Sequence, residues 1–457
     1  MSFPAHIFKA YDIRGVFEEE ITEALAYAIG RAYADFMKAE LGKEQPTLVV
    51  CQDMRASSPE LKKQVIRGMT AQGVNIVDIG LASTPTFYFG VAYYGYDGGI
   101  QITASHNPAQ FNGFKMVRAH AVPVSGDTGI MTIRDMVERG VFETSARIGT
   151  VTIREGVLEE QISYALKQVD VQTIKPYTVV VDSANGMGGL LMTELFRHLP
   201  CTLVPLYFDL NGNFPNHEAD PLKDENNRWV QEKVREIGAD LGIACDGDAD
   251  RIFFIDNTGT TINPAIIRGI LAQVYLRQYP GAQICYDIRP GKITVDMITE
   301  AGGVPVVTKV GHSLIKEKAR EVGAAFAGES SGHFFVKAPH GFFEMPEIVV
   351  LKLLKEFSDS GKTTHDYIAP LERYIHSGEI NFSVPEKQAV FDRLRGRYGD
   401  HLTYDFDGLS FTYDDWWFNV RASNTENKVR LNLEGMTKGI VQEKTKEVSG
   451  IIQGDAR

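Results

Sequence analysis

Three short segments of this sequence resemble one another, and each runs from apolar residues directly into a loop of reactive side chains. They are residues 95–104, 235–244 and 320–327, which read GYDGGIQITA, REIGADLGIA and REVGAAFA. Self-similarity within a chain indicates a repeated structural unit. Each apolar end predicts a buried strand, and the loop after such a strand is where an α/β sheet exposes its reactive groups. The repetition therefore predicts three related α/β units.

Helical and strand patterns alternate along most of the chain before residue 360. Apolar residues recur at helical spacing from 21 to 36, which predicts an amphipathic helix, and a buried-type strand follows at 47–51. The alternation continues with a strand at 178–182 and, further on, a strand at 282–287. Strands that are separated by helices need crossover connections and form mainly parallel sheets.

The C-terminal part follows a different pattern. Asp407-Gly408 is a favoured hairpin dipeptide, and alternating strands follow it before a final helix. We therefore predict an α/β fold of four domains, in which three related α/β units with mixed, mainly parallel sheets precede a smaller C-terminal α+β domain. The expected domain limits are 1–147, 148–254, 255–366 and 367–457.

Charge and composition limit the class of partner. The 457 residues carry a net charge of −12, whereas nucleic acids and anionic membranes select for surplus Lys and Arg. We expect neither as a partner, although a local basic pocket could still bind a small anionic substrate. The four cysteines are scattered, the start is not signal-like, and no apolar run approaches the roughly 20 residues that cross a bilayer. These features predict a soluble cytoplasmic protein with reduced thiols.

Asp246, Asp248 and Asp250 place three carboxylates within five residues at the end of a predicted strand. Like charges this close repel one another unless a cation neutralises them, and oxygen-only ligation suits Mg²⁺ before Ca²⁺. A calcium loop of the EF-hand type is excluded, because its sixth position would be Arg251 instead of Gly and its twelfth Asn257 instead of Glu. A magnesium site is favoured over a plain acidic turn.

The loop after the first repeated segment begins with Ser105, which is followed by His-Asn-Pro. Pro108 disfavours helix at Asn107, so the chain leaves the strand as an ordered loop. A serine held in this way is a nucleophile if a neighbouring group removes its proton. The same residues also suit a hydrogen-bonded turn without chemistry, and this segment alone favours the turn.

Two later loops also have two interpretations each. Gly328-Glu-Ser-Ser-Gly-His333 offers a carboxylate, two hydroxyls and an imidazole, which suit vicinal sugar hydroxyls but also an ordinary β-turn. Arg421-Ala-Ser-Asn-Thr425, with Arg430 beyond it, supplies a guanidinium and short hydroxyls, the parts of a phosphate cradle. The alternative there is a surface turn before a salt-bridged strand. For both loops, the choice between the two interpretations depends on the other motifs of the sequence.

Four motifs occur in order along the chain: Thr103-Ala-Ser-His-Asn-Pro108, Asp246-Gly-Asp-Ala-Asp-Arg251, Gly328-Glu-Ser-Ser-Gly-His333 and Arg421-Ala-Ser-Asn-Thr425. In this combination the sequence resembles the α-D-phosphohexomutase superfamily, and most closely its phosphomannomutase/phosphoglucomutase branch. The resemblance spans the chain from Tyr11-Asp-Ile-Arg-Gly15 to Arg430. Each motif alone could arise by chance, whereas four in order with suitable spacing indicate a family.

The resemblance implies both an architecture and a reaction. It implies four domains around a central cleft, and interconversion of hexose 1-phosphate and hexose 6-phosphate, with mannose and/or glucose as the sugar. Ser105 would carry a phosphoryl group and pass it to the substrate. The resulting hexose 1,6-bisphosphate, which also serves as activator, would turn around and return its other phosphoryl group to Ser105. One Mg²⁺ per chain would be held by phosphorylated Ser105 with Asp246, Asp248 and Asp250.

The resemblance also assigns roles to the remaining motif residues. Arg251 and Mg²⁺ would neutralise charge on the moving phosphoryl group. The general base stays open among Lys115, His333, Arg14 and Arg251. Glu329 and Ser331 would hold the sugar O3 and O4 hydroxyls, and further substrate-binding positions are His333, Tyr11, Arg289 and His312. The phosphate that is not reacting would be bound by Arg421, Ser423, Asn424, Thr425 and Arg430.

One departure from the family pattern concerns the sugar. Position 330 varies with sugar preference, and Met is familiar there in dual mannose/glucose enzymes, whereas this chain has Ser330. The preferred hexose therefore stays open, and a phosphoglucosamine mutase is an alternative. A metal-dependent sugar phosphatase would instead use Ser105 for hydrolysis, and a sugar-phosphate binding protein would carry no phosphoserine. The oligomeric state also stays open.

Overall fold

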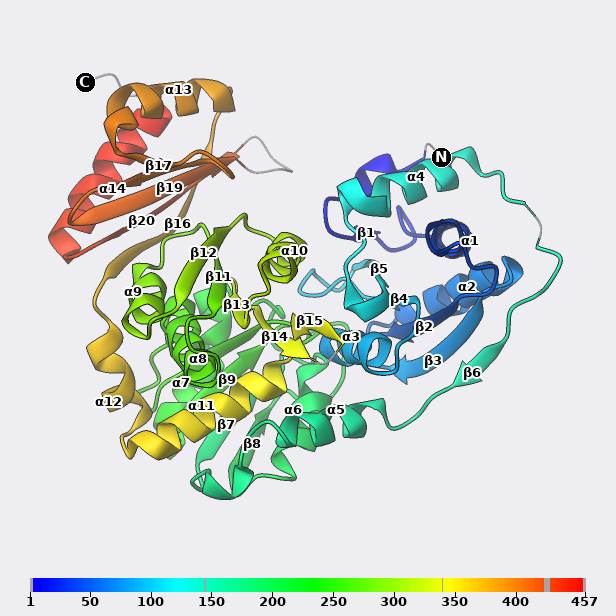
Figure 1. The fold of residues 1–457 in the computed structure, drawn as a ribbon, viewed down its shortest axis with the longest axis horizontal. Coiled ribbons are helices and arrows are strands. Elements are labelled where there is room, and N and C mark those ends of the chain that lie inside the picture. Colours follow the sequence, from blue (N-terminus) through cyan, green and yellow to red (C-terminus); the bar gives the residue numbers. More distant parts are fainter. Residues whose placement is uncertain (1–2, 144, 339, 423–427, 455–457) are drawn as a thin grey trace. The chain divides into compact units, whose positions relative to one another are not determined.

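The computed structural model describes residues 3–143, 145–338, 340–422 and 428–454, and is drawn in Figure 1. The chain divides into two compact units. The first comprises Met1–Ile262 and Ser331–His365, and the second comprises Asn263–Ser330 and Asp366–Arg457.

The first unit contains a six-stranded mixed sheet in the order β1-β5-β4-β2-β3-β6. Strands β4, β2, β3 and β6 are parallel to their neighbours in that run, whereas β5 is antiparallel to both β1 and β4. The strands are β1 (Ile13–Val16), β2 (Thr47–Gln52), β3 (Asn75–Leu81), β4 (Gly98–Ile102), β5 (Phe111–Arg118) and β6 (Val151–Ile153).

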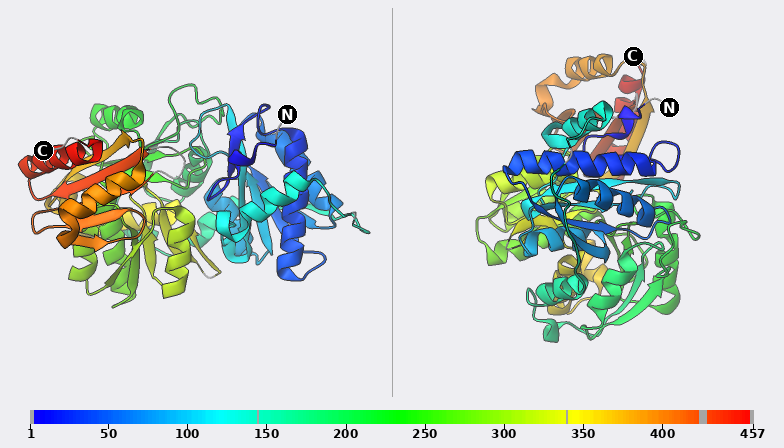
Figure 2. Two further views of the ribbon diagram at one scale, coloured as in Figure 1. Left: turned by 90° about the horizontal axis from the view of Figure 1, so that it is seen from above. Right: turned by 90° about the vertical axis from the view of Figure 1, so that its right-hand side faces the viewer.

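Four helices accompany this sheet: α1 (Glu23–Leu41), α2 (Ser58–Ala71), α3 (Thr84–Tyr93) and α4 (Met131–Arg139). Helix α1 begins after Thr22, whose hydroxyl accepts a hydrogen bond from the Leu25 N–H, and ends at Gly42 in the left-handed conformation. Its apolar face carries Ile29 and Tyr33 into a core shared with α2 and the sheet. Figure 2 shows α1 beside α2 in both of its views.

A second sheet of the first unit has four strands in the order β10-β9-β7-β8, of which only β10 is antiparallel to its neighbour. Its strands are β7 (Thr178–Asp182), β8 (Thr202–Leu206), β9 (Leu241–Cys245) and β10 (Ile252–Ile255). Its helices are α5 (Val157–Leu166), α6 (Gly188–Phe196) and α7 (Arg228–Ile237). The antiparallel hairpin of β14 (Phe334–Ala338) and β15 (Gly341–Glu344), with helix α11 (Pro346–Ser360), completes the unit.

The second unit begins with three parallel strands in the order β12-β11-β13. These strands are β11 (Gln283–Asp287), β12 (Val304–Thr308) and β13 (Phe326–Gly328). The helices that alternate with them are α8 (Pro264–Gln278), α9 (Lys292–Glu300) and α10 (His312–Val322). The short helix α12 (Thr364–Ile368) contains the division between the two units.

The C-terminal part of the second unit is a five-stranded antiparallel sheet in the order β16-β20-β19-β18-β17. Asp407 and Gly408 both have left-handed backbones, with φ of 52° and 89°, and lie in the turn between β17 and β18, as the sequence predicts. Helices α13 and α14 cover one face of this sheet around a shared apolar core. The elements are β16 (Ile375–Ser383), α13 (Lys387–Tyr398), β17 (Leu402–Tyr404), β18 (Leu409–Thr412), β19 (Trp416–Ala422), β20 (Lys428–Gly435) and α14 (Lys438–Gln453).

The same strand order recurs in three sheets. In β3-β2-β4, β8-β7-β9 and β12-β11-β13 the first strand of each set lies between the second and the third. The loops that begin at Ser105, Asp246 and Glu329 all follow the third strand of their set. The predicted kinship of the three α/β units and the predicted fold class, with a smaller C-terminal domain, are therefore confirmed. The limits of the four domains stay predictions.

Strand β5 is not apparent from the sequence, because Asn112, Gly113 and Lys115 interrupt its apolar pattern. The polar residues are nevertheless buried, since Nδ2 of Asn112 donates to the hydroxyls of Ser57 and Ser58 and Lys115 faces acidic partners in the site. Within the described ranges, no helix combines the length and the apolar character that crossing a membrane requires.

Candidate active site

Three aspartates converge in the loop between β9 and β10. Asp246, Asp248 and Asp250 are each at most 3% exposed, and carboxylate oxygens from all three lie within 4.8 Å of one another. Burial and the neighbouring aspartates raise the pKa of Asp246 well above its usual value. One buried oxygen of Asp248 and one of Asp250 accept no hydrogen bond from the described residues. These oxygens fit a hard dication such as Mg²⁺, whose charge would relieve the repulsion.

Ser105 follows β4 and lies against the aspartate loop. Its backbone is left-handed, with a φ of 52°, which is uncommon for any residue except glycine. Its Oγ donates a hydrogen bond to Oδ2 of Asp246 at 3.2 Å and lies 3.1 Å from Nδ1 of His106. Gly247 permits this approach, because a Cβ on Gly247 would lie 2.4 Å from the Ser105 carbonyl oxygen. The serine and the acidic cluster, predicted from separate motifs, are therefore adjacent.

Arg55, which the sequence analysis misses, fixes the backbone of the Ser105 loop. It follows β2 and is 1% exposed. Its guanidinium donates hydrogen bonds to the carbonyl oxygens of Ser105 at 2.9 Å, Asn107 at 2.6 Å, Pro108 at 2.8 Å and Phe111 at 2.9 Å. The only signal in the sequence is its position just beyond a predicted strand, at the end nearest the reactive loops.

Lys115 extends from β5 into the aspartate cluster. Its Nζ lies 2.5 Å from Oδ2 of Asp248 and 2.6 Å from Oδ2 of Asp250. Burial alone would lower the pKa of Lys115, but the two carboxylates outweigh it and raise the pKa well above its usual value. Thr84, at the start of α3, also donates its hydroxyl to Oδ2 of Asp248 at 2.5 Å. The described cluster thus holds one ammonium between two of its three carboxylates.

Arg14 connects β1 to the Ser105 loop. Its guanidinium donates to Oδ1 of Asn107 at 2.6 Å and to the carbonyl oxygen of Ala104 at 3.2 Å, and it pairs with Asp12 at 2.6 Å. Tyr11 lies just before β1 and is partly buried. Arg14, one of the predicted base candidates, therefore contacts the loop that carries Ser105.

Arg251 and His333 face each other beside the same cluster. Nε of Arg251 donates to Nε2 of His333 at 3.3 Å, while the Arg251 backbone N–H donates to Oδ1 of Asp246 at 3.1 Å. Nδ1 of His333 lies 3.1 Å from the hydroxyl oxygen of Ser331. Ser331 and His333 therefore belong to the first unit, as do Ser105 and the three aspartates.

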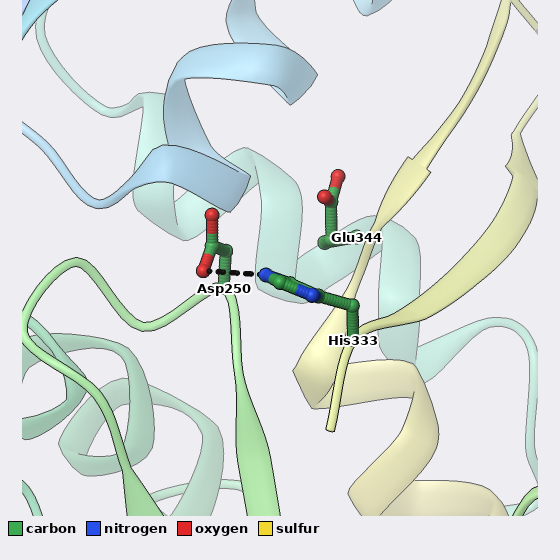
Figure 3. Close-up of side chains that lie close together, drawn as sticks. All are labelled: Asp250, His333 and Glu344. Atoms are coloured by element: carbon green, nitrogen blue, oxygen red, sulfur yellow. Dashed lines mark ion pairs between the residues drawn. The ribbon is translucent and has the colours of Figure 1, made fainter. Parts of the chain in front are cut away.

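A second set of ligand-type side chains shares one aspartate with the first. Ligand atoms of Asp250, His333 and Glu344 lie within 4.8 Å of one another, and all three residues are buried. Figure 3 shows the imidazole of His333 directed at Asp250, where Nε2 and Oδ1 are 3.2 Å apart. Glu344 ends β15 and is not among the site residues that the sequence predicts.

In the second unit, the loop after β13 is built on a buried ion pair. Nη1 of Arg268 lies 2.7 Å from Oδ1 of Asp287, and neither side chain is exposed. Burial would raise the pKa of Asp287, but Arg289 and Arg268 outweigh it and lower the pKa below its usual value. Arg289 contacts the other carboxylate oxygen at 2.5 Å. The backbone N–H and the hydroxyl of Ser330 donate to Oδ1 of Asp287 at 3.2 and 2.8 Å. The side chain of Ser330 is therefore engaged inside its own unit.

Glu329 and the start of α10 are also joined in this unit. Oε1 of Glu329 accepts a hydrogen bond from the Gly311 N–H at 2.8 Å, and His312 is the first residue of α10. In the C-terminal part, Nε of Arg421 lies 3.1 Å from Asp407, whose other carboxylate oxygen accepts from the Val310 N–H at 2.7 Å. Asp407 thus links Arg421 to the segment just before α10, and Glu329 binds the next residue of that same segment.

Arg430 on β20 lies 3.6 Å from Glu379 on β16. The other members of the predicted phosphate cradle, Ser423, Asn424 and Thr425, lie outside the described residues. The first unit brings together Ser105, Asp246, Asp248, Asp250, Lys115, Arg14, Arg251, Ser331 and His333. The second unit contains Arg289, His312, Glu329, Arg421 and Arg430.

Comparison with known protein families gives four consecutive matches. The matching descriptions are phosphoglucomutase/phosphomannomutase α/β/α domain I over residues 5–144, domain II over residues 159–259 and domain III over residues 263–374. The C-terminal domain of the same family matches residues 379–450. Together these matches cover most of the chain.

Individual relatives match over nearly their whole length. A Xanthomonas campestris protein named "Phosphohexose mutases" is 40% identical over 464 residues, which is 99% of this chain and 100% of the relative. An Escherichia coli phosphomannomutase is 38% identical, with 98% and 99% of the two chains covered. A crystal structure of a phosphoglucomutase/phosphomannomutase family protein from Burkholderia thailandensis superimposes with a TM-score of 0.89 at 32% identity, covering 100% of this chain and 99% of that one.

Proposed function

The chain belongs to the phosphoglucomutase/phosphomannomutase family, and on this premise we propose that Ser105 is the phosphoryl carrier of its reaction. The protein is a phosphohexomutase, an isomerase that interconverts hexose 1-phosphate and hexose 6-phosphate. Phosphorylated Ser105 gives its phosphoryl group to the substrate, and the hexose 1,6-bisphosphate that forms returns the other phosphoryl group to the serine. The observation that carries this assignment is the 3.2 Å contact between Ser105 Oγ and the buried aspartate cluster.

The three aspartates support a metal site next to the carrier. We propose that Asp246, Asp248 and Asp250 hold one Mg²⁺ together with phosphorylated Ser105. When bound, the ion supplies positive charge beside the phosphoryl oxygens. The chain adds a cation of its own there: Nε of Arg251 lies 3.8 Å from Oδ2 of Asp246, the oxygen to which Ser105 donates. Phosphoryl transfer depends mainly on such positioning and charge neutralisation.

His333 is the general base that we favour among the predicted candidates. Arg14 and Arg251 remain protonated at any ordinary pH and cannot accept a proton. Lys115 is anchored as an ammonium between Asp248 and Asp250. An imidazole can accept the proton of an attacking hydroxyl, and Nε2 of His333 already accepts from Arg251. The assignment predicts that His333→Gln lowers kcat more than it raises KM.

The second unit supplies the groups that we propose for the rest of the substrate. Glu329 would accept hydrogen bonds from sugar hydroxyls, as would Ser331 from the first unit, and Arg289, Tyr11 and His312 would contribute further contacts. The non-reacting phosphate would bind to Arg421, Ser423, Asn424, Thr425 and Arg430. A guanidinium suits this role because its fork of donors matches phosphate oxygens.

The assignment of Ser105 is tested by intact mass and by turnover in the same preparation. The protein is given Mg²⁺ and a trace of hexose 1,6-bisphosphate, which we propose as activator, and is assayed with mannose, glucose and glucosamine 1-phosphates. We expect one added phosphate on the wild-type chain and none on Ser105→Ala, together with loss of isomerisation. Ser145→Ala serves as the matched control. An active Ser105→Ala protein would refute the role.

The substrate panel also decides between the remaining alternatives. Mannose or glucose phosphates as the fastest substrates would support our proposal, and glucosamine 1-phosphate as the fastest would favour a phosphoglucosamine mutase. Release of inorganic phosphate as fast as isomerisation would favour a sugar phosphatase. From the net charge we expect no nucleic-acid or membrane partner, and we expect a cytoplasmic location.

A further inference from the structure

The group formed by Asp250, His333 and Glu344 has the composition of a transition-metal site. The three side chains are 3%, 5% and 1% exposed and come from separate parts of the first unit. Asp250 lies in the loop after β9, His333 just before β14 and Glu344 at the end of β15. Two carboxylates and one imidazole differ from the all-oxygen aspartate cluster, because imidazole favours zinc and its neighbours over magnesium.

One pair in this group already has the spacing of two metal ligands. Nε2 of His333 and Oδ1 of Asp250 are 3.2 Å apart, as drawn in Figure 3. Two ligands bound tetrahedrally to Zn²⁺ at about 2.0–2.1 Å lie about 3.3 Å from each other. The pair would therefore need almost no movement to hold an ion.

Both atoms of this pair are held in place by contacts within the first unit. Nε of Arg251 donates to Nε2 of His333 at 3.3 Å, and the same nitrogen forms an ion pair with Oδ1 of Asp250 at 3.2 Å. A metal ion bound here would replace the proton between the imidazole and the carboxylate, because ligand groups release their protons when they bind a metal.

Glu344 supplies the third ligand. One of its carboxylate oxygens lies within 4.8 Å of the ligand atoms of both Asp250 and His333. The three side-chain torsions of a glutamate allow this carboxylate to adjust its distance to a bound ion. A site with three protein ligands leaves a fourth position open, as in catalytic zinc sites.

We propose that Asp250, His333 and Glu344 bind a first-row transition-metal dication, for which Zn²⁺ is the best match, in a site that shares Asp250 with the aspartate cluster. Occupancy would engage His333, the base that we favour, and would draw Asp250 away from Mg²⁺. The ion is therefore an inhibitor of the isomerisation. This consequence rests on the proposed function, whereas the binding itself does not.

The binding is tested with Co²⁺ as a coloured probe for zinc sites, added to the full chain saturated with Mg²⁺. We expect one Co²⁺ per chain, with the visible ligand-field absorption of a site of low coordination number, while Mg²⁺ stays bound. Glu344→Gln should weaken Co²⁺ binding at least about tenfold, since loss of even an indirect partner costs 10–100-fold in affinity. Glu347→Gln, which changes a buried glutamate outside the group, should leave the affinity unchanged.

Three results would overturn the proposal. One is displacement of Mg²⁺ by Co²⁺ with no second ion bound. Another is loss of Co²⁺ binding in Asp246→Asn, which changes only the aspartate cluster. The third is a Zn²⁺ X-ray absorption spectrum without an imidazole ligand, a measurement on the wild-type chain that does not depend on the folding of a variant. Turnover in Mg²⁺ alone is recorded separately, so an inactive protein would count against the proposed function and not against the metal site.

Discussion

Gly247 is the point at which the aspartate loop touches the Ser105 loop, and replacing it with alanine tests whether that contact positions the serine. The new Cβ would lie 2.4 Å from the Ser105 carbonyl oxygen, whereas ordinary van der Waals contact begins at 3.4 Å. Both partners are held in place, because the Ser105 carbonyl accepts a hydrogen bond from the buried Arg55 and the Gly247 carbonyl accepts one from the Met187 N–H. The backbone of Gly247 does not have a positive φ, so alanine introduces the clash without a conformational penalty of its own.

The size of the effect follows from the displacement. One loop must move by about 1 Å to reach ordinary contact, and the 3.2 Å bond between Ser105 and Asp246 lies directly beside the moved atoms. A misplacement of about 1 Å at a reacting centre can cost on the order of 100-fold in rate. We therefore expect kcat to fall about 100-fold, which corresponds to about 2.7 kcal/mol in the activation free energy.

The assay is steady-state isomerisation of the preferred hexose 1-phosphate, with the phosphorylation state of Ser105 read by intact mass. Gly396→Ala is the matched control, because a Cβ at Gly396, within helix α13, meets no atom within 4 Å. The control should keep the wild-type kcat, and both variants should unfold cooperatively. A Gly247→Ala protein with wild-type kcat would show that the contact between the loops does not position the serine.

Three further predictions concern stability and metal. Burial raises the pKa of Glu347 from 4.5 to about 7, so the wild type should lose about 3 kcal/mol of unfolding free energy as the pH rises from below 4.5 to above 7, and urea denaturation of Glu347→Gln should lack this loss. Arg268→Met removes one of the two guanidiniums that pair with buried Asp287, while Arg289 stays, and should cost about 1.5–3 kcal/mol in the same assay; a loss below about 1 kcal/mol would contradict the ion-pair argument. Chelation of divalent ions should abolish isomerisation and lower the unfolding temperature, and Mg²⁺ should restore both; full activity after dialysis against chelator would exclude a metal requirement.

Much of the fold and of the site is predictable because the end of a buried strand is marked in the sequence by a change from apolar to polar residues. The apolar run before Ser105 and the run before Asp246 identify buried strands, and their abrupt change to polar residues identifies the reactive edge. The repetition of this pattern predicts related sheets, and the shared strand order confirms them. The hairpin at Asp407-Gly408 is predictable for the same local reason, since the turn requires left-handed backbones.

What the sequence conceals are polar residues whose partners are distant along the chain. Arg55 lies 50 residues from the Ser105 carbonyl that it binds, and Lys115 lies 133 residues from Asp248. A single arginine or lysine in a sequence is more often solvated than buried, so Arg55 attracts no attention and Lys115 is singled out only by the family resemblance. Glu344 is hidden in the same way, because it becomes a ligand-type residue only when the hairpin places it beside His333.

The family resemblance links position 330 to sugar preference, and in this chain the same side chain also belongs to a buried hydrogen-bond network. Ser330 donates to Asp287, which is itself one half of the buried pair with Arg268. A substitution at 330 that alters the choice of hexose would also remove a hydrogen bond from a buried carboxylate, so a gain in one substrate would come with a less stable domain. We therefore expect that descendants of this sequence reach a new preference by coupled changes at 330 and 268 or 287, and seldom by a single step.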